Sequence, residues 1–291
     1  MVMTFSGSMS LPFLESTNYT INTTLLDLYV RPHPNTADLR PDAPAGKELE
    51  QVPVVDLGRL LNLVGRREEE ASRLRSACEK WGFFQVVNHG IPKETVEDMK
   101  RNVMGFFALP LAEKAALAQE PGEIVGMPRR LSTKTGWTCS SSSHNRPTTA
   151  TSASGRPNLQ PSSKNCLESY SVEVQRVAGE LLRAMAKNLV VRDHSDMTRL
   201  AVSQAVRMNY FPPCLEAQVD RVLGLSPHSD AVALTLLLQV SPVPVLQIKR
   251  NDRWIPVMPL PGALVVNVGD VVEVLINRTT GGTRVSSTGR W

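Results

Sequence analysis

The last third of the chain consists of short apolar segments, and this pattern constrains the fold more than any other feature. Turn residues such as proline, glycine and aspartate separate the segments, which span residues 205–211, 234–240, 244–249, 253–257 and 263–268. Short runs rich in Val, Leu and Ile between such turns are typical of strands, whereas helices need longer periodic stretches. The pattern therefore predicts a strand-rich unit made of several short strands.

A histidine and a carboxylate stand just before the second of these segments, where His228 and Asp230 follow Pro227. Residues two apart on a strand share a face, so we expect the imidazole beside the carboxylate. One nitrogen and one oxygen ligand form two-thirds of the 2-His-1-carboxylate set that holds non-haem Fe(II). Taken alone, the pair fits a surface turn after Pro227 better than a metal site. Many short strands around a metal, however, indicate a jelly roll of the cupin kind.

Several ordered motifs surround this pair. They occupy residues 207–214, 223–230, 246–248, 254–257 and 264–270, and the first of them reads Arg-Met-Asn-Tyr-Phe-Pro-Pro-Cys. In their order and spacing they resemble the plant 2-oxoglutarate- and Fe(II)-dependent dioxygenases, in particular the senescence-related and alkaloid O-demethylase-like branch. The resemblance covers most of residues 50–120 and 157–277.

The resemblance implies an α+β fold, in which a double-stranded β-helix (jelly roll, cupin-like) forms the core beside an N-terminal region of helices and strands. It implies His228 and Asp230 as metal ligands and places Asn209 and Phe211 at the cosubstrate site. The cofactors would be Fe(II) and 2-oxoglutarate, with ascorbate as an optional addition, and no residue receives a separate catalytic role. The family commonly has a tyrosine at position 211, and the loss of its hydroxyl contact costs about 1 kcal/mol.

The reaction implied by the resemblance is hydroxylation, desaturation or O-demethylation of a small specialised metabolite. The family completes its metal site with a further histidine and grips 2-oxoglutarate with an Arg-x-Ser motif. The chain has five histidines, and none of them follows His228. The alternative is therefore a catalytically inactive, truncated relative that lacks the second metal histidine and the 2-oxoglutarate-binding arginine. A structural zinc protein is excluded because no third or fourth ligand is in view.

Two stretches depart from the family pattern in a way that indicates a shifted reading frame. Residues 282–291 can be encoded by DNA that, read one base earlier, gives the family sequence Y-K-S-V-E-H-R-A-V. Residues 129–136 can be encoded by DNA that gives V-V-S-A-Q-K-L in another frame. We therefore expect that residues from about 278 onward come from a frameshift, a pseudogene or a mis-joined gene model. Residues 124–156 are either a second shifted tract or a real loop insertion. With almost no apolar periodicity, they should lack regular structure.

The chain accordingly divides into five predicted regions. These are an N-terminal arm (1–50), an N-terminal dioxygenase region (51–123), the aberrant tract (124–156), a helical connector (157–200) and a truncated jelly-roll domain (201–291). Helical periodicity predicts helices at 67–81, 93–107, 110–118 and 166–189, a short helix near 25–29 and a strand within 81–90. His89, at the end of that strand, is interpreted as a packing residue.

Composition excludes several classes of partner. The 291 residues are 42% hydrophobic and 21% charged with a net charge of +4, but no basic run interleaved with aromatics indicates nucleic-acid binding. No apolar run is long enough to span a membrane, and no secretory signal is visible. Four cysteines without Cys-x-x-Cys spacing are typical of reduced thiols in a cytoplasmic protein. We expect a small-molecule substrate as the partner, and the oligomeric state stays open.

Overall fold

A computed structural model of the chain describes residues 2–7, 51–62, 67–110, 113, 137–139, 143–144, 161–188, 204–210, 227–230, 232–251, 253–280 and 289–290. The helices are α2 (Leu57–Leu61), α3 (Arg67–Lys80), α4 (Lys93–Ala108), α6 (Pro161–Asn188) and α8 (Asp270–Thr280). The strands of the main sheet are β1 (Val2–Gly7), β2 (Val54–Asp56), β3 (Phe83–Val87), β4 (Trp137–Cys139), β5 (Ser143–His144), β6 (Gln204–Tyr210), β7 (Leu234–Gln239) and β10 (Leu264–Val268). A smaller sheet contains β8 (Gln247–Arg250), β9 (Arg253–Pro256) and β11 (Gly289–Arg290).

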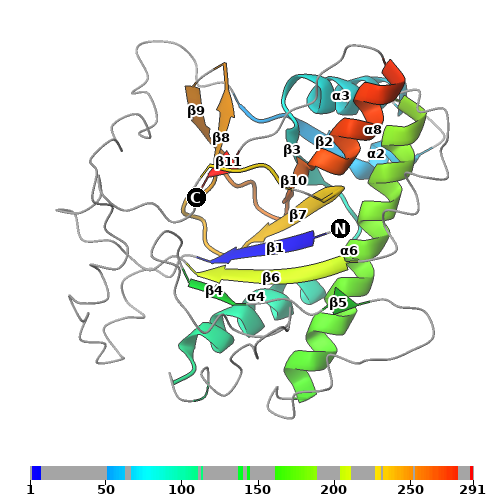
Figure 1. The fold of residues 1–291 in the computed structure, drawn as a ribbon. Coiled ribbons are helices and arrows are strands. Elements are labelled where there is room, and N and C mark those ends of the chain that lie inside the picture. Colours follow the sequence, from blue (N-terminus) through cyan, green and yellow to red (C-terminus); the bar gives the residue numbers. More distant parts are fainter. Residues whose placement is uncertain are drawn as a thin grey trace, which may run out of the picture.

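The main sheet runs in the order β2-β3-β10-β7-β1-β6-β4, with β5 paired to β6 (Figure 1). β10 is antiparallel to both β3 and β7, and the β10–β7 register places Asn267 opposite Thr235. β1 lies between β6 and β7 and runs parallel to both. In Figure 1 the N-terminus therefore lies beside the middle strands, whereas α6 runs along one side of the sheet.

Residues at alternate positions of β3, β7 and β10 face two different cores, as the two-residue period of a strand requires. The larger core holds alternate residues of the central strands together with apolar residues of α3, α4 and α6. The strand residues in this core are Phe84, Val86, Leu234, Leu236, Leu238, Leu264, Val266 and Val268. Phe83, Leu237 and Val265 point the other way, into a smaller core with Leu246, Ile248 and Val257 next to β8 and β9. Helices thus cover one face of the main sheet, and the second sheet lies over the other.

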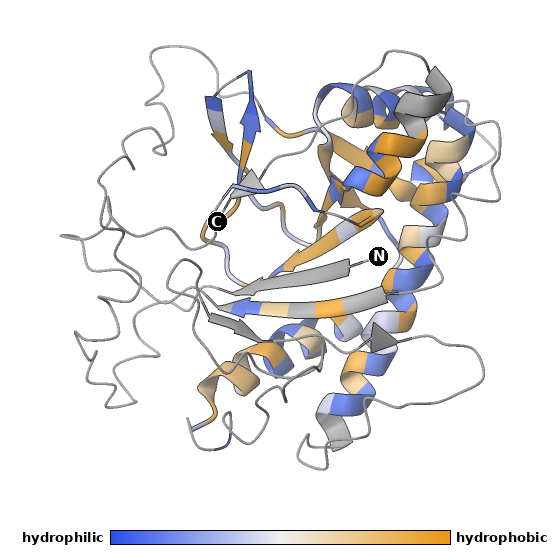
Figure 2. Cartoon of the chain, in the orientation of Figure 1, coloured by the Kyte–Doolittle hydropathy of each residue, from blue (hydrophilic) through white to orange (hydrophobic). Residues whose placement is uncertain are grey.

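The stripe on α6 explains why this long helix packs on the sheet. Its large buried apolar residues recur at helical spacing, so they lie on one side of the helix; they are Tyr170, Val174, Val177, Leu181, Leu182 and Met185. Figure 2 shows the resulting alternation of hydrophilic and hydrophobic colour along α6, and the concentration of apolar residues on β7. The helix predicted for residues 166–189 is confirmed, and it begins earlier, at Pro161.

The elements that were not predicted from the sequence include β1, β4, β5 and α8. β4 and β5 lie within residues 124–156 and pair antiparallel with β6, so the expectation of no regular structure is wrong for residues 137–139 and 143–144. β1 comes from the predicted arm, and α8 follows β10 directly. Because the main sheet takes strands from four of the five predicted regions, those regions share one sheet; their boundaries stay predictions.

Other expectations fall partly outside the described residues. The helix near 25–29 and nearly all of the helix at 110–118 lie there. Among the described cysteines, Cys78 and Cys166 are not in a disulfide. No helix in the described residues is both long and apolar enough to cross a membrane.

Candidate metal centre at the His-x-Asp loop

The structure brings His228 and Asp230 together, but not by the predicted means. His228 forms an isolated β-bridge, whereas Asp230 belongs to no strand; both precede β7, which begins at Leu234. The loop nevertheless directs the two side chains toward each other, with 3.4 Å between His228 Nε2 and Asp230 Oδ1. The expected juxtaposition is therefore present, although only His228 has a strand-type bridge and Asp230 lies outside the strands.

Two polar side chains from neighbouring strands hold the Asp230 carboxylate. Thr235 Oγ1 donates to Asp230 Oδ2 at 2.5 Å, and Asn267 Nδ2 donates to the same oxygen at 2.8 Å. Burial alone would raise the pKa of Asp230, but the hydrogen bonds from His228, Thr235 and Asn267, together with the imidazole charge, hold this pKa below its usual range. Asp230 is therefore a carboxylate at neutral pH, the form that binds a cation.

Backbone hydrogen bonds hold the loop against the start of α8. Asp270 N–H donates to Asp230 O at 2.8 Å, and Gly269 N–H donates to Ala233 O at 2.9 Å. The Ser229 hydroxyl donates to Asp270 Oδ2 at 3.1 Å. The two backbones approach so closely that a Cβ on Gly269 would lie 2.0 Å from Val232 O, closer than any real Cβ contact.

The donor atoms present fit two positions of a divalent metal site. An imidazole nitrogen and a carboxylate oxygen 3.4 Å apart can both contact one ion, since ligand atoms bound at about 2.1 Å and at right angles lie about 3 Å apart. His228 is 38% and Asp230 25% exposed at the side chain, so the pair is open to solvent. Within the described ranges, no group of three or more His, Cys, Asp or Glu residues could hold a metal. A third ligand would have to come from elsewhere.

Of the two predicted cosubstrate residues, Asn209 is described by the structure, and it lies apart from this pair. Asn209 is buried on β6, on the strand face opposite to the core residue Met208. Through β1, the register sets Asn209 level with Gln239 and Ala205 level with Thr235. Asn209 is thus four residues further along the sheet than Thr235, about 13 Å at the usual rise of a strand. Phe211 lies outside the described residues.

Sequence reasoning missed Thr235, Asn267 and Gly269. A signal was nevertheless present, because Thr235 and Asn267 are each a polar residue inside an otherwise apolar strand segment. A polar side chain buried in such a segment needs a hydrogen-bond partner. Its position alone indicated that each of them contacts another polar group, although not which one.

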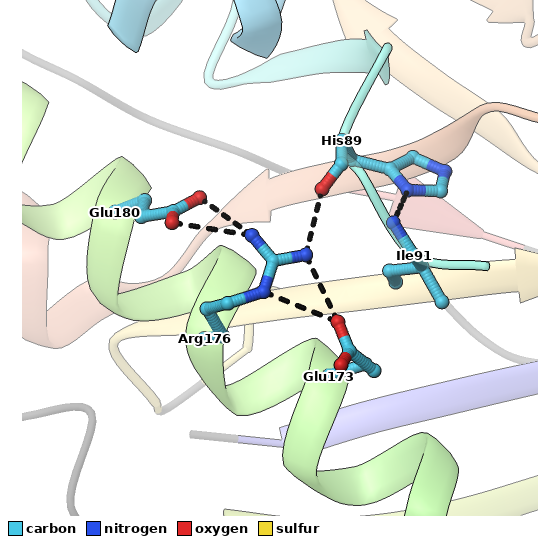
Figure 3. Close-up of polar contacts among 5 residues, drawn as sticks. All are labelled: His89, Ile91, Glu173, Arg176 and Glu180. Atoms are coloured by element: carbon cyan, nitrogen blue, oxygen red, sulfur yellow. Dashed lines mark hydrogen bonds and ion pairs between the residues drawn. The ribbon is translucent and has the colours of Figure 1, made fainter.

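His89 has a structural role, as interpreted from the sequence (Figure 3). Its Nδ1 accepts a hydrogen bond from Ile91 N–H at 3.2 Å, so the proton is on Nε2, which lies 3.0 Å from Gly262 O. The His89 carbonyl accepts a hydrogen bond from Arg176 of α6, whose guanidinium is also paired with Glu173 and Glu180. This network fastens the turn after β3 to α6.

The environment of His89 predicts a pH effect on stability. Burial, together with the Arg176 charge, lowers the pKa of His89, although the hydrogen bond to Gly262 opposes this. As the pH falls below about 6.5, the unfolded chain binds a proton at this position before the folded one does, so acid destabilises the fold. We expect His89→Gln to reduce the slope of unfolding free energy against pH between pH 7 and 5, by at most about 1.4 kcal/mol per pH unit. Urea unfolding at several pH values measures this slope, and parallel slopes for the two proteins would contradict the assignment.

A cavity of about 240 Å³ lies at the other end of β7, where Gln85, His89, Lys100 and Gln239 line it. Neither His228 nor Asp230 belongs to its lining. His228 and Asp230, and not the residues of this cavity, therefore form the candidate site.

Comparison with known proteins extends these observations. The family model for the N-terminal region of a non-haem dioxygenase in morphine synthesis matches residues 52–162, and the model of the 2OG-Fe(II) oxygenase superfamily matches residues 202–290. Protein SRG1 of Arabidopsis thaliana is 39% identical over 237 residues, which cover 79% of this chain and 65% of SRG1. The chain thus spans slightly less than two thirds of the length of that relative. S-norcoclaurine synthase 1 of Coptis japonica is 38% identical over 253 residues, which cover 86% of this chain and 70% of that protein.

A solved structure agrees with the fold. The crystal structure of JOX2 in complex with 2OG, Fe and JA superimposes with a TM-score of 0.72 at 27% identity, covering 97% of this chain and 78% of that one. The jelly-roll core and the α+β class predicted from the sequence are thereby confirmed. The chain belongs to the 2OG-Fe(II) oxygenase superfamily.

Proposed function

We propose that the protein is an Fe(II)- and 2-oxoglutarate-dependent oxygenase that oxidises a small specialised metabolite. The observation that carries this proposal is the approach of His228 Nε2 to Asp230 Oδ1 at 3.4 Å, on a loop held in place by Thr235 and Asn267. S-norcoclaurine synthase 1 and JOX2 support a small organic molecule as the substrate class. Hydroxylation, desaturation and O-demethylation are all compatible with this class.

In this proposal each part of the chain has a defined task. His228 and Asp230 supply two protein ligands to Fe(II), and a ligand outside the described residues completes the set. Asn209, further along the sheet on β6, and Phe211 contribute to the cosubstrate site, with ascorbate as an optional reductant. When bound, Fe(II) and 2-oxoglutarate supply the oxidising chemistry, in which one oxygen atom of O₂ enters succinate, CO₂ leaves, and the other oxygen oxidises the substrate.

The test is 2-oxoglutarate-dependent oxygen uptake and succinate formation by the purified full chain with Fe(II), in the presence of alkaloid and flavonoid candidates. We expect uptake with the wild-type protein and none with His228→Ala or Asp230→Ala, because each removes a metal ligand. Asp98→Ala is the control, since Asp98 is an exposed aspartate on α4 that pairs with Arg101. It should leave uptake unchanged.

Two results would contradict the proposal. Uptake that persists in His228→Ala would show that the pair does not hold the reacting metal. Metal binding at the pair without any uptake would favour the alternative, a catalytically inactive relative that lacks a complete site.

A further inference from the structure

We propose that Asn267 and Thr235 are positioning residues that decide which oxygen of Asp230 faces the metal. They occupy Oδ2 with two hydrogen bonds and so leave Oδ1 as the single metal-binding oxygen. The inference rests on the proposed function, because it assumes that His228 and Asp230 hold a cation, and it adds two residues to which neither the sequence motifs nor the comparisons assign a role.

Hydrogen bonds already occupy one of the two oxygens of the Asp230 carboxylate. A carboxylate oxygen offers about two lone-pair directions for hydrogen bonds or metals. Asp230 Oδ2 accepts from Thr235 Oγ1 at 2.5 Å and from Asn267 Nδ2 at 2.8 Å, so both directions are filled. The other oxygen, Oδ1, is the one that lies 3.4 Å from His228 Nε2. The arrangement favours a carboxylate that binds through one oxygen over one that chelates through both.

The two hydrogen-bond donors to Asp230 belong to paired strands of the main sheet. Thr235 on β7 and Asn267 on β10 are directly opposite each other in the antiparallel register. Opposite residues of such a pair have neighbouring side chains on the same face, so both donors point to one spot. Thr235 is 4% exposed, and the strands behind it are buried in the core. Packed strands therefore fix the two donors, whereas Asp230 itself lies outside the strands.

The amide oxygen of Asn267 also supports the inference. Asn267 Oδ1 is buried and has no hydrogen-bond partner within the described part of the chain. The remaining residues of β10 are Leu264, Val265, Val266 and Val268. An apolar residue of similar size would fill the space without leaving a buried oxygen unpaired. The asparagine is thus unfavourable for packing alone, which indicates that its amide donor to Asp230 is what the site requires.

Four variants of the full chain test the inference. Asn267→Leu and Thr235→Val keep the approximate size of each side chain and remove its donor, whereas Thr235→Ser keeps the hydroxyl. Ser241→Ala is the matched control, because Ser241 is also nearly buried and loses one hydrogen bond, to Val243 N–H, just beyond the opposite end of β7. Asp230→Ala and His228→Ala show the metal affinity that remains when one of the two proposed metal ligands is removed.

The measurement is the dissociation constant for Mn(II), an oxygen-stable probe for the site, from the free-ion signal in electron paramagnetic resonance. We expect the constant to rise about 10- to 100-fold in Asn267→Leu and in Thr235→Val, the usual effect of losing a partner of a metal ligand. Thr235→Ser and Ser241→Ala should stay near the wild-type value. A double variant that combines Asn267→Leu with Thr235→Val should lose less affinity than the product of the two single losses, because both side chains donate to one oxygen.

Thermal unfolding of the same proteins without metal distinguishes positioning from stability. A positioning role predicts weaker Mn(II) binding in variants whose unfolding temperature stays close to that of Ser241→Ala. Unchanged affinity in Asn267→Leu and Thr235→Val, together with loss of binding in His228→Ala, would overturn this inference and leave the proposed function intact. Equal affinity in His228→Ala and wild type, or no Mn(II) binding at all, would overturn the proposed function itself. If either Asn267→Leu or Thr235→Val does not fold, the Mn(II) affinity of the other, compared with that of Ser241→Ala, tests the positioning role.

Discussion

Gly269→Ala is expected to lower the free energy of unfolding by about 3 kcal/mol or more and to remove metal binding at the same time. The added Cβ would lie 2.0 Å from Val232 O and 2.8 Å from Asp230 O, and both are backbone atoms. A backbone carbonyl cannot move aside as a flexible side chain can, so the loop must separate from the start of α8. The same shift would break the hydrogen bond from Asp270 N–H to Asp230 O and displace the carboxylate.

Urea unfolding and Mn(II) titration of the purified variant measure the two effects. Gly105→Ala is the matched control, because Gly105 lies inside α4 and a Cβ there would meet nothing within 4 Å. Alanine is the better helix former, so this control should gain about 0.5–1 kcal/mol in unfolding free energy and bind Mn(II) normally. A fully stable Gly269→Ala protein would show that the close approach of the loop to α8 is wrong.

Phe84→Ala is the second change with a large expected effect, a loss of about 3–5 kcal/mol in the free energy of unfolding. Phe84 is fully buried on β3, opposite Val266 of β10, within the core that joins the helices to the main sheet. Removing its ring takes away buried apolar surface and leaves a cavity that the packed strands cannot close. Denaturant unfolding followed by far-UV circular dichroism measures this loss of unfolding free energy.

Val172→Ala serves as the comparison for this truncation. Val172 lies on α6 but is 65% exposed, so the same kind of shortening removes almost no buried contact. Its unfolding free energy should stay within about 0.5 kcal/mol of the wild-type value. A similar loss in both variants would mean that the core around Phe84 is not packed as described.

The elements that the sequence predicted well are those with a strong local pattern. The alternation of β7 and β10 residues between the two cores and the apolar stripe on α6 follow from residue spacing alone, because strand and helix periods map sequence directly onto faces. The pairing of β4 and β5 with β6 was not predictable in this way. A sheet ladder joins backbone groups that every non-proline residue carries, so a tract rich in Ser and Thr can supply strands without any apolar alternation.

The same distinction applies to the candidate site. The sequence by itself determined that His228 and Asp230 are neighbours, because two residues so close along the chain can hardly be far apart in space. Only the tertiary structure decided what holds them: Asn267, 37 residues away, reaches Asp230 because β10 pairs with β7 in the register that sets it opposite Thr235. Likewise, the position of β1 between β6 and β7 depends on pairing with strands far along the chain. Contacts between distant residues depend on strand order and register, which packing of the whole core selects and local spacing does not encode.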